Sequence, residues 1–351
     1  MSWPRTELGA VEQTAVDAVR RCAHVLQRAP SDLDPLLDRI GDARFVLLGE
    51  ATHGTHEFYR VRAEITRRLI EEKSFTAVAV EADWPDAYRV NRWVRAASDD
   101  ASAEQALSAF KRFPILMWRN ADVLDLVGWL REYNEAQPVK TRRAGIYGLD
   151  LYALYTSIAA VVEYLESVDP ALAERARARY SCFEHFGDDS REHNSHLGDA
   201  RATEMGERGE WNVGQLVRER FGGDAVLVGF TTYTGTVTAA SNWDAPAERK
   251  RVRPALPGSY EALLHETELP RFLLRLEDQD ARLALAGPLL ERAIGVIYRP
   301  ETERASHYFR ARLPDQFDAV FHYDHTRAVE PLEKGSPWRE GDVPETWPEG
   351  I

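Results

Sequence analysis

Residues 45–83, FVLLGEATHGTHEFYRVRAEITRRLIEEKSFTAVAVEAD, decide the fold. The stretch opens with an unbroken apolar run of strand length, and a second such run occupies 75–83. Between the two runs, residues 58–72 have helical periodicity. Continuous apolar runs are typical of strands buried on both faces. Their alternation with helices indicates a parallel sheet covered by helices on both sides.

The same alternation continues outside this stretch. Further strands are expected in RAGIYGLDL, AVLVGFTTY, AIGVIY and DAVFHYD, at 143–151, 225–233, 293–298 and 318–324. Helices are expected over 9–28, 32–39, 84–94, 104–133 and 157–180, with Pro170 starting a second helix inside the last range. We therefore predict an α/β fold with a mostly parallel central sheet flanked by helices. Residues 1–334 are interpreted as a single α/β hydrolase-like domain, followed by a surface tail at 335–351.

Composition excludes several classes of protein. The chain has 351 residues, with 44 Lys and Arg against 57 Asp and Glu, a net charge of −13. This balance argues against a protein that grips nucleic acid or an anionic membrane, because both need a basic face. No apolar run approaches the roughly 20 residues of a membrane span, and MSWPRTELGA lacks the basic-then-apolar pattern expected of a secretory signal. With only Cys22 and Cys182 as cysteines, we expect a soluble cytoplasmic protein.

Polar residues that follow the predicted strands form the candidate site. GEATHGTHE at 49–57 follows the first strand, Glu81 the second and Asp150 the third, while Tyr233 comes after AVLVGF. Ligands of open parallel sheets bind outside the carboxyl ends of the strands. One acidic strand end is ordinary, but three of them with two histidines predict a site on one rim.

His53 is the central candidate in this group. Gly49 and Gly54 flank it and allow the backbone to turn sharply between strand and helix. Its imidazole can accept a proton near neutral pH, and the Glu50 carboxylate can orient the ring. The chain contains no G-x-S-x-G, G-x-x-x-x-G-K-[ST] or G-x-G-x-x-G motif. Direct attack by an activated water is therefore the simplest hydrolysis.

Histidine spacing raises the alternative of a metal. Six of the ten histidines form three H-x-x-H pairs: His53/His56, His193/His196 and His322/His325. A zinc site needs three or four ligands, but HGTHE matches neither H-E-x-x-H nor H-x-x-E-H. Residues three apart on a strand, such as His322 and His325, point to opposite faces. We expect no metal and no other cofactor, with a metal-dependent hydrolase that uses the His/Glu cluster as the alternative.

The longer motifs resemble the erythromycin esterase family. They are FVLLGEATHGTHEF through VEADWPDAYRVN, FKRFPILMWRN, GIYGLDLY, HNSHLGD through RERFG, LVGFTTYTGTVTAAS and ERAIGVIYRP through AVEPL. The resemblance covers nearly the whole chain and implies an α/β fold with a deep cleft at the strand ends. Characterised relatives open the lactone ring of macrolide antibiotics, the basis of antibiotic resistance, while many relatives have no known substrate.

The resemblance also implies roles for individual residues. By motif, His53 corresponds to the water-activating histidine, and Glu50 and Glu81 match essential carboxylates. His307 in SHYF and His196 in HNSHLGD match cleft histidines. Arg60, on the same helix face as Glu57 and Glu64, is a candidate for contact with the carbonyl oxygen. The remaining candidates for substrate binding are His56, Asp150 and Tyr233.

The family pattern is interrupted between Glu192 and His193. In relatives a long helical region and an apolar strand precede HNSH, whereas here the polar stretch 181–192 runs directly into it. We therefore expect an internal deletion, with 151–192 as the remnant of the helical region. The leading hypothesis is a hydrolase that takes a small-molecule ester or lactone. A truncated, inactive relative that acts as a binding protein is the second alternative, and the oligomeric state stays open.

Overall fold

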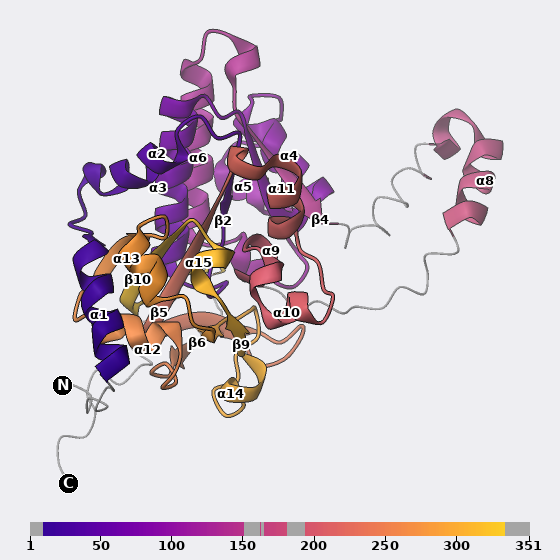
Figure 1. The fold of residues 1–351 in the computed structure, drawn as a ribbon. Helices are drawn as coiled ribbons and strands as arrows, with labels where there is room; N and C mark the ends of the chain where they lie inside the picture. The colour runs from indigo at the N-terminus through magenta and orange to yellow at the C-terminus, as the bar shows by residue number, and fades with distance from the viewer. Residues whose placement is uncertain (1–9, 151–161, 163–164, 181–193, 334–351) are drawn as a thin grey trace. The chain divides into compact units, whose positions relative to one another are not determined.

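The computed structural model describes residues 10–150, 162, 165–180 and 194–333 (Figure 1). The chain divides into two compact units. The first contains residues 1–65, 113–122 and 192–351, and the second contains 66–112 and 123–191. A single domain over 1–334 stays a prediction. His193 and the predicted tail at 335–351 lie outside the described residues.

A six-stranded sheet is the centre of the first unit, with the order β1-β7-β10-β5-β2 and with β6 paired to β5. Its strands are β1 (His24–Val25), β2 (Phe45–Leu48), β5 (Ala225–Ala240), β6 (Ala247–Val252), β7 (Arg271–Arg275) and β10 (Ala319–Thr326). β2, β5 and β10 run parallel to one another, while β1, β6 and β7 pair in antiparallel register. The α/β class is confirmed, but the sheet is mixed, because antiparallel strands extend both sides of its parallel centre.

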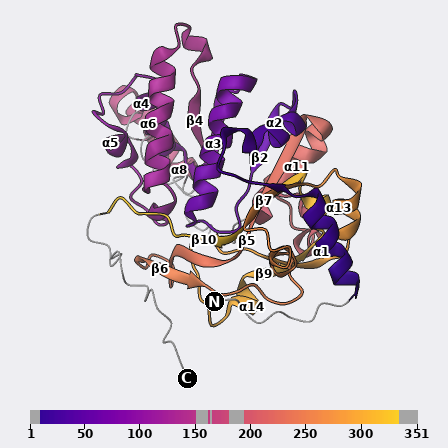
Figure 2. The same cartoon turned by 90° about the vertical axis from the view of Figure 1, so that its left-hand side faces the viewer.

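Strand periodicity divides the side chains of this sheet between two covered faces. On one face, Phe230 and Phe321 stack, and Phe230 packs against Phe58 of α3 (His56–Lys73). The opposite face packs on α1 (Ala10–Cys22), α12 (Tyr260–His265) and α13 (Gln279–Ala284), and its buried core includes Val19, Leu227, Leu264, Phe272, Leu274 and Val320. Helices therefore cover both faces, as predicted, and Figure 2 shows α1 and α13 beside each other.

Several element boundaries differ from the sequence prediction. The helix expected over 9–28 ends at Cys22, because His24–Val25 pairs with β7 as β1. AIGVIY at 293–298 makes only isolated bridges to Thr52 and Ala240. The segment lies in the sequence between two strands that were not expected, β8 (Leu289–Arg292) and β9 (Tyr308–Ala311). These two strands pair with each other in antiparallel register.

The second unit contains the parallel pair β3 (Ala77–Asp83) and β4 (Gly145–Asp150). Its helices include α4 (Trp84–Val94), α5 (Ala103–Leu107), most of α6 (Ala121–Ala136) and α8 (Pro170–Tyr180), so the helix expected over 104–133 is interrupted. Among the described strands, β3 and β4 form a sheet of their own. They do not hydrogen-bond to the sheet that contains β2, and convergence of the first three strand ends on one rim stays a prediction.

Candidate active site

A buried carboxylate links an imidazole and a guanidinium directly after β2. The His53 Nδ1 atom lies 2.7 Å from Glu50 Oε1. The other carboxylate oxygen of Glu50 lies 2.6 Å from a terminal nitrogen of Arg62 on α3. Glu50 is only 5% exposed and His53 only 1%. The three side chains therefore form a fixed arrangement inside the first unit.

Backbone hydrogen bonds hold the loop that carries His53. The His53 amide donates to the Ile294 carbonyl at 3.2 Å, and the Ile294 amide donates to the Ala51 carbonyl at 2.7 Å. On the other side, the Thr238 amide of β5 donates to the Gly54 carbonyl at 3.1 Å. A Cβ atom on Gly54 would lie 1.9 Å from the Thr238 carbonyl oxygen. Close approach to β5 thus adds a second reason for glycine beside His53.

The charges of this cluster favour an ionised Glu50. Burial raises the pKa of the Glu50 carboxyl, but Arg62 and His53 outweigh burial and leave the pKa below its usual range. Burial also disfavours the charge of Arg62, yet the facing carboxylate keeps the Arg62 pKa raised. An ionised carboxylate can only accept hydrogen bonds, so His53 Nδ1 must carry the proton in this pair. The lone pair of the neutral ring then resides on Nε2, as a general base requires.

Arg62, which was not among the predicted site residues, is the arginine that contacts Glu50. Arg60 Nε lies 3.2 Å from Glu64 Oε1, and these side chains are 42% and 44% exposed. The Arg60–Glu64 contact agrees with the prediction that these two residues share one face of the helix. A role for Arg60 in substrate binding stays a prediction. A signal for Arg62 was present in the sequence, because its helical spacing places it on the same face of α3 as Phe58 and Ile65, which are buried.

His307 is attached to the same backbone segment as the His53 loop. It follows α14 (Glu303–Ser306), and its carbonyl accepts a hydrogen bond from the Ala293 amide at 2.9 Å. Ala293 directly precedes Ile294, which holds the loop at Ala51 and His53. Burial lowers the pKa of His307 to about 4. His307 is therefore neutral at neutral pH, and its ring can serve as a hydrogen-bonding group.

Two other candidates are engaged by partners that the sequence did not indicate. His56 Nδ1 lies 2.9 Å from a carboxylate oxygen of Asp122. The Tyr233 ring stacks on His265 of α12, with centroids 3.7 Å apart and an interplanar angle of 2°. His265 Nδ1 is in turn 2.5 Å from Asp324 Oδ1 on β10. No motif joins Tyr233, His265 and Asp324, because they meet only through the packing of α12 on the sheet.

The structure separates the remaining candidates by unit. Glu81 and Asp150 belong to the second unit, and Glu81 falls in the irregular part of β3 between Val80 and Asp83. His196 lies in the first unit on α9 (Asn194–Leu197). Contact of these three residues with substrate stays a prediction.

The histidine pairs can be assessed where the structure describes them. His322 is buried beside Thr231, whereas His325 is exposed, so this pair does point to opposite faces of β10. Within the described part of the chain, no group of three or more His, Cys, Asp or Glu could hold a metal ion. None of the helices described is long and apolar enough to cross a membrane.

Comparison with known proteins identifies the family. The model of the erythromycin esterase family matches residues 70–192 and 190–326. The chain belongs to the erythromycin esterase family. The two matched stretches meet at 190–192, next to the junction where the sequence predicts an internal deletion of the family pattern. They begin after Arg62, so the geometry of Glu50, His53 and Arg62 is an observation independent of this match.

Curated relatives in sequence match part of the chain. Erythromycin esterase type II of Escherichia coli is 32% identical over 115 residues, 33% of this chain and 26% of that protein. The putative hydrolase YbfO of Bacillus subtilis (strain 168) is 26% identical over 132 residues, 37% of this chain and 27% of that protein. The matched part of the chain therefore spans about a quarter of the length of each relative.

Solved structures extend the likeness in fold to most of the chain. A crystal structure described as a succinoglycan biosynthesis protein has a TM-score of 0.72 and 19% identity, covering 93% of this chain and 100% of that chain. An erythromycin esterase mutant in its open conformation has a TM-score of 0.53 and 15% identity, covering 86% and 95%. At these identities the likeness shows a shared fold.

Proposed function

We propose that this protein is a hydrolase of the erythromycin esterase type that opens an ester or lactone by water attack, with His53 as general base. The observation that carries the proposal is the buried pair of Glu50 Oε1 and His53 Nδ1 at 2.7 Å. A base that is oriented by a carboxylate, itself fixed by Arg62 at 2.6 Å, has the arrangement that general base catalysis requires.

The proposed reaction needs one proton acceptor and forms no covalent bond between the substrate and the enzyme. His53 Nε2 removes a proton from water while the water oxygen attacks the carbonyl carbon. The tetrahedral intermediate then expels the alkoxide, which takes the proton from the imidazolium, and the products are a carboxylic acid and an alcohol. Glu50 stabilises the imidazolium that forms between these steps. General base catalysis of this kind contributes about 10²–10⁴-fold.

Other residues have supporting roles in the proposal. Glu81 and the neutral His307 position the water and stabilise charge that develops on the carbonyl oxygen. Arg62 keeps Glu50 ionised and oriented, a role supported by their 2.6 Å ion pair. Contacts with the small-molecule substrate are assigned to His56, Arg60, Asp150, His196 and Tyr233.

The test is hydrolysis of a panel of esters and lactones, including a macrolide, by the purified full chain. We expect turnover of at least one substrate and a loss of at least ~10²-fold in His53→Ala. His325→Ala is the matched control, because His325 is an exposed histidine of the same unit. Near-normal turnover by a folded His53→Ala protein would remove His53 from the mechanism.

Two outcomes of the same screen would favour the alternatives. Loss of all activity on dialysis against a chelator, restored by a stoichiometric metal, would favour a metal-dependent hydrolase. Absence of turnover across the panel, with saturable binding of a member, would favour an inactive relative that acts as a binding protein.

A further inference from the structure

Arg292, the last residue of β8, has the largest fully buried side chain in the part of the chain that the structure describes, and it is only 1% exposed. Its Nη1 atom donates to the Arg253 carbonyl at 2.7 Å, and its Nη2 atom donates to the carbonyls of Thr232 at 2.5 Å and Tyr233 at 2.8 Å. Nη1 also lies 3.2 Å from Glu303 Oε1. The guanidinium group therefore joins β5, the segment directly after β6, and α14.

The backbone of Arg292 is also held by other elements. Its amide donates to Oε1 of Glu261 on α12 at 2.9 Å, and Glu261 is fully buried. On the same strand, Arg292 pairs with Tyr308 of β9 in antiparallel register. The position at which the chain leaves β8 is therefore fixed by both the backbone and the side chain of Arg292.

The two residues after Arg292 carry hydrogen bonds to both candidate catalytic histidines. The Ala293 amide donates to the His307 carbonyl at 2.9 Å. Ile294 makes two backbone hydrogen bonds with the loop that carries His53, at 2.7 and 3.2 Å. A displacement of Arg292 would move Ala293 and Ile294, and would thereby change the spacing between His53 and His307.

A second path leads from Arg292 to the ring of His307. Glu303 Oε1, which contacts Arg292, also accepts a hydrogen bond from the Tyr298 hydroxyl at 3.1 Å. The Tyr298 ring packs against the His307 ring, with centroids 5.4 Å apart and an interplanar angle of 52°. Glu303 and Tyr298 are both buried. Arg292 is therefore linked to the orientation of the His307 ring as well as to its backbone.

Stability alone does not require a charge at the position of Arg292. Taking an ion out of water is costly, and a well-packed apolar side chain of similar volume is often equally stable in such a place. An apolar side chain would, however, leave the carbonyls of Thr232, Tyr233 and Arg253 without these donors. A planar guanidinium presents its N–H donors in fixed directions, so it can hold acceptors from separate segments in one geometry. This geometric function is the one that an apolar residue could not perform.

We infer that Arg292 is a positioning residue of the candidate active site, which sets the relative position of His53 and His307. The inference rests on the proposed function, in which His53 takes a proton from water and His307 stabilises the carbonyl oxygen. Both histidines then act on one carbonyl group, so their relative position affects the rate. A misplacement of about 1 Å can lower a rate by about 10²-fold.

The kinetic test is Arg292→Lys, which keeps the positive charge but replaces the planar group with a single ammonium. With a substrate found in the ester and lactone panel, we expect kcat to fall by about 10²-fold and KM to change by less than about threefold. Leu36→Ala is the control for lost stability, because Leu36 is fully buried in the same unit but lies on a different helix, α2 (Asp34–Ile40). At a temperature where all three proteins are folded, the control should keep the kcat of the wild type.

NMR of the imidazole nitrogens tests the same inference without turnover. In Arg292→Lys the ring signals of His53 and His307 should shift, while those of the exposed His325 stay in place. Glu303→Gln is a milder variant, because it removes the charge of one partner of Arg292 and leaves the backbone contacts of Ile294 intact. It should shift the His307 signals and leave those of His53 unchanged.

The outcomes separate this inference from the proposed function. Unshifted His53 and His307 signals in folded Arg292→Lys, or a kcat that falls no further than in Leu36→Ala, would overturn the role of Arg292. If Arg292→Lys does not fold, unshifted His307 signals in Glu303→Gln would overturn it as well. Shifted signals in a protein whose wild type turns over no substrate would support the positioning by Arg292 and count against the proposed function.

Discussion

Replacement of Arg62 by methionine tests whether the buried Glu50 carboxylate depends on the guanidinium beside it. Arg62→Met keeps a long side chain on α3 but leaves Glu50, only 5% exposed, without the guanidinium at 2.6 Å. The matched control is Arg60→Met, two positions away on the same helix. Its partner Glu64 is half-exposed, so the control removes the same charge from a pair that solvent already screens.

The structure sets the expected size of the effect. Breaking a buried ion pair by removing one partner costs about 3–5 kcal/mol. His53 Nδ1 still donates to Glu50 at 2.7 Å, so we expect a loss near the lower end, about 3 kcal/mol. At roughly 2–4 °C per kcal/mol, Tm should fall by about 6–12 °C. Arg60→Met should lose only about 0–1 kcal/mol.

The pH dependence separates a charge effect from a packing effect. The pKa of Glu50 is lowered in the folded protein. Its ionised form therefore stabilises the fold above its unfolded pKa of about 4.3, and this contribution is lost as the pH falls through the folded pKa. In Arg62→Met, burial without the cation raises the pKa of Glu50, so protonation relieves the penalty. The loss relative to wild type should shrink between about pH 7 and pH 4.

Chemical unfolding of the wild type and the two variants, followed by circular dichroism at several pH values, measures these differences. Equal unfolding free energies for Arg62→Met and Arg60→Met would refute the assignment of Arg62 as the partner of Glu50. A loss in Arg62→Met that is the same at every pH would show that packing, rather than the buried charge, causes the destabilisation.

Three further predictions concern the surroundings of this cluster. Gly54→Ala should lower the free energy of unfolding by about 1–3 kcal/mol and slow any hydrolysis by about 10²-fold, because the new Cβ would lie 1.9 Å from the β5 backbone. The control Gly128→Ala should not destabilise α6, because its new Cβ has no atom within 4 Å. Equal calorimetric melting curves for the two variants would contradict this. Burial raises the pKa of Asp324, but its hydrogen bond with His265 and the nearby ring of His322 hold the pKa at about 2. Asp324→Asn should therefore lose about 1–2 kcal/mol near neutral pH and progressively less as the pH falls toward 2 in denaturant titrations. A constant loss would argue against the charge. NMR titration of His307 should give a midpoint near pH 4, because burial favours the neutral ring. His307 should therefore stabilise the fold above about pH 6.5 and lose that contribution as the pH falls toward 4. A midpoint above about pH 6 would show that the ring is hydrated.

Strand prediction succeeded for most continuous apolar runs, with AIGVIY at 293–298 as the exception. β2, β3, β4, β5 and β10 were all expected from their apolar runs. β3 is less buried than such a run indicates, because Ala77 and Ala79 are exposed. β6, AERKRV, and β7, RFLLR, were missed, since charged residues interrupt or bound their apolar content. Such strands form because a neighbour with free hydrogen-bonding groups is already in place. Pairing partners depend on the whole sheet, which is why the pairing of β3 with β4 alone, among the described strands, was not predictable from their sequences.

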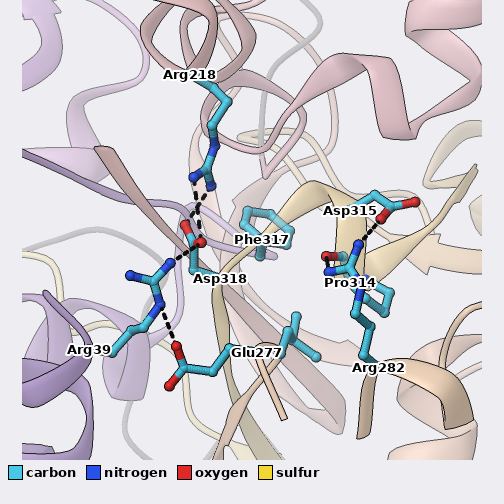
Figure 3. A pocket seen from close by; sticks show the side chains of 9 residues that line it. Arg39, Arg218, Glu277, Arg282, Pro314, Asp315, Phe317 and Asp318 are labelled. Atoms are coloured by element: carbon cyan, nitrogen blue, oxygen red, sulfur yellow. Dashed lines mark hydrogen bonds and ion pairs between the residues drawn. The ribbon is translucent and has the colours of Figure 1, made fainter. Parts of the chain in front are cut away.

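The sequence by itself determined the parts of the candidate site that are local in the chain. Glu50 and His53 are three residues apart in one loop, so their contact follows from the strand, the turn and the glycines around them. Only the tertiary structure decided that Arg62 completes this pair and that His265 meets Asp324. It also decided that Asp318 lies between Arg39 and Arg218, which are far apart in the sequence (Figure 3). The physical reason is that a short segment restricts its own backbone and nearest side chains. The burial and the charged partners of a residue depend on segments that approach it only after the chain has folded.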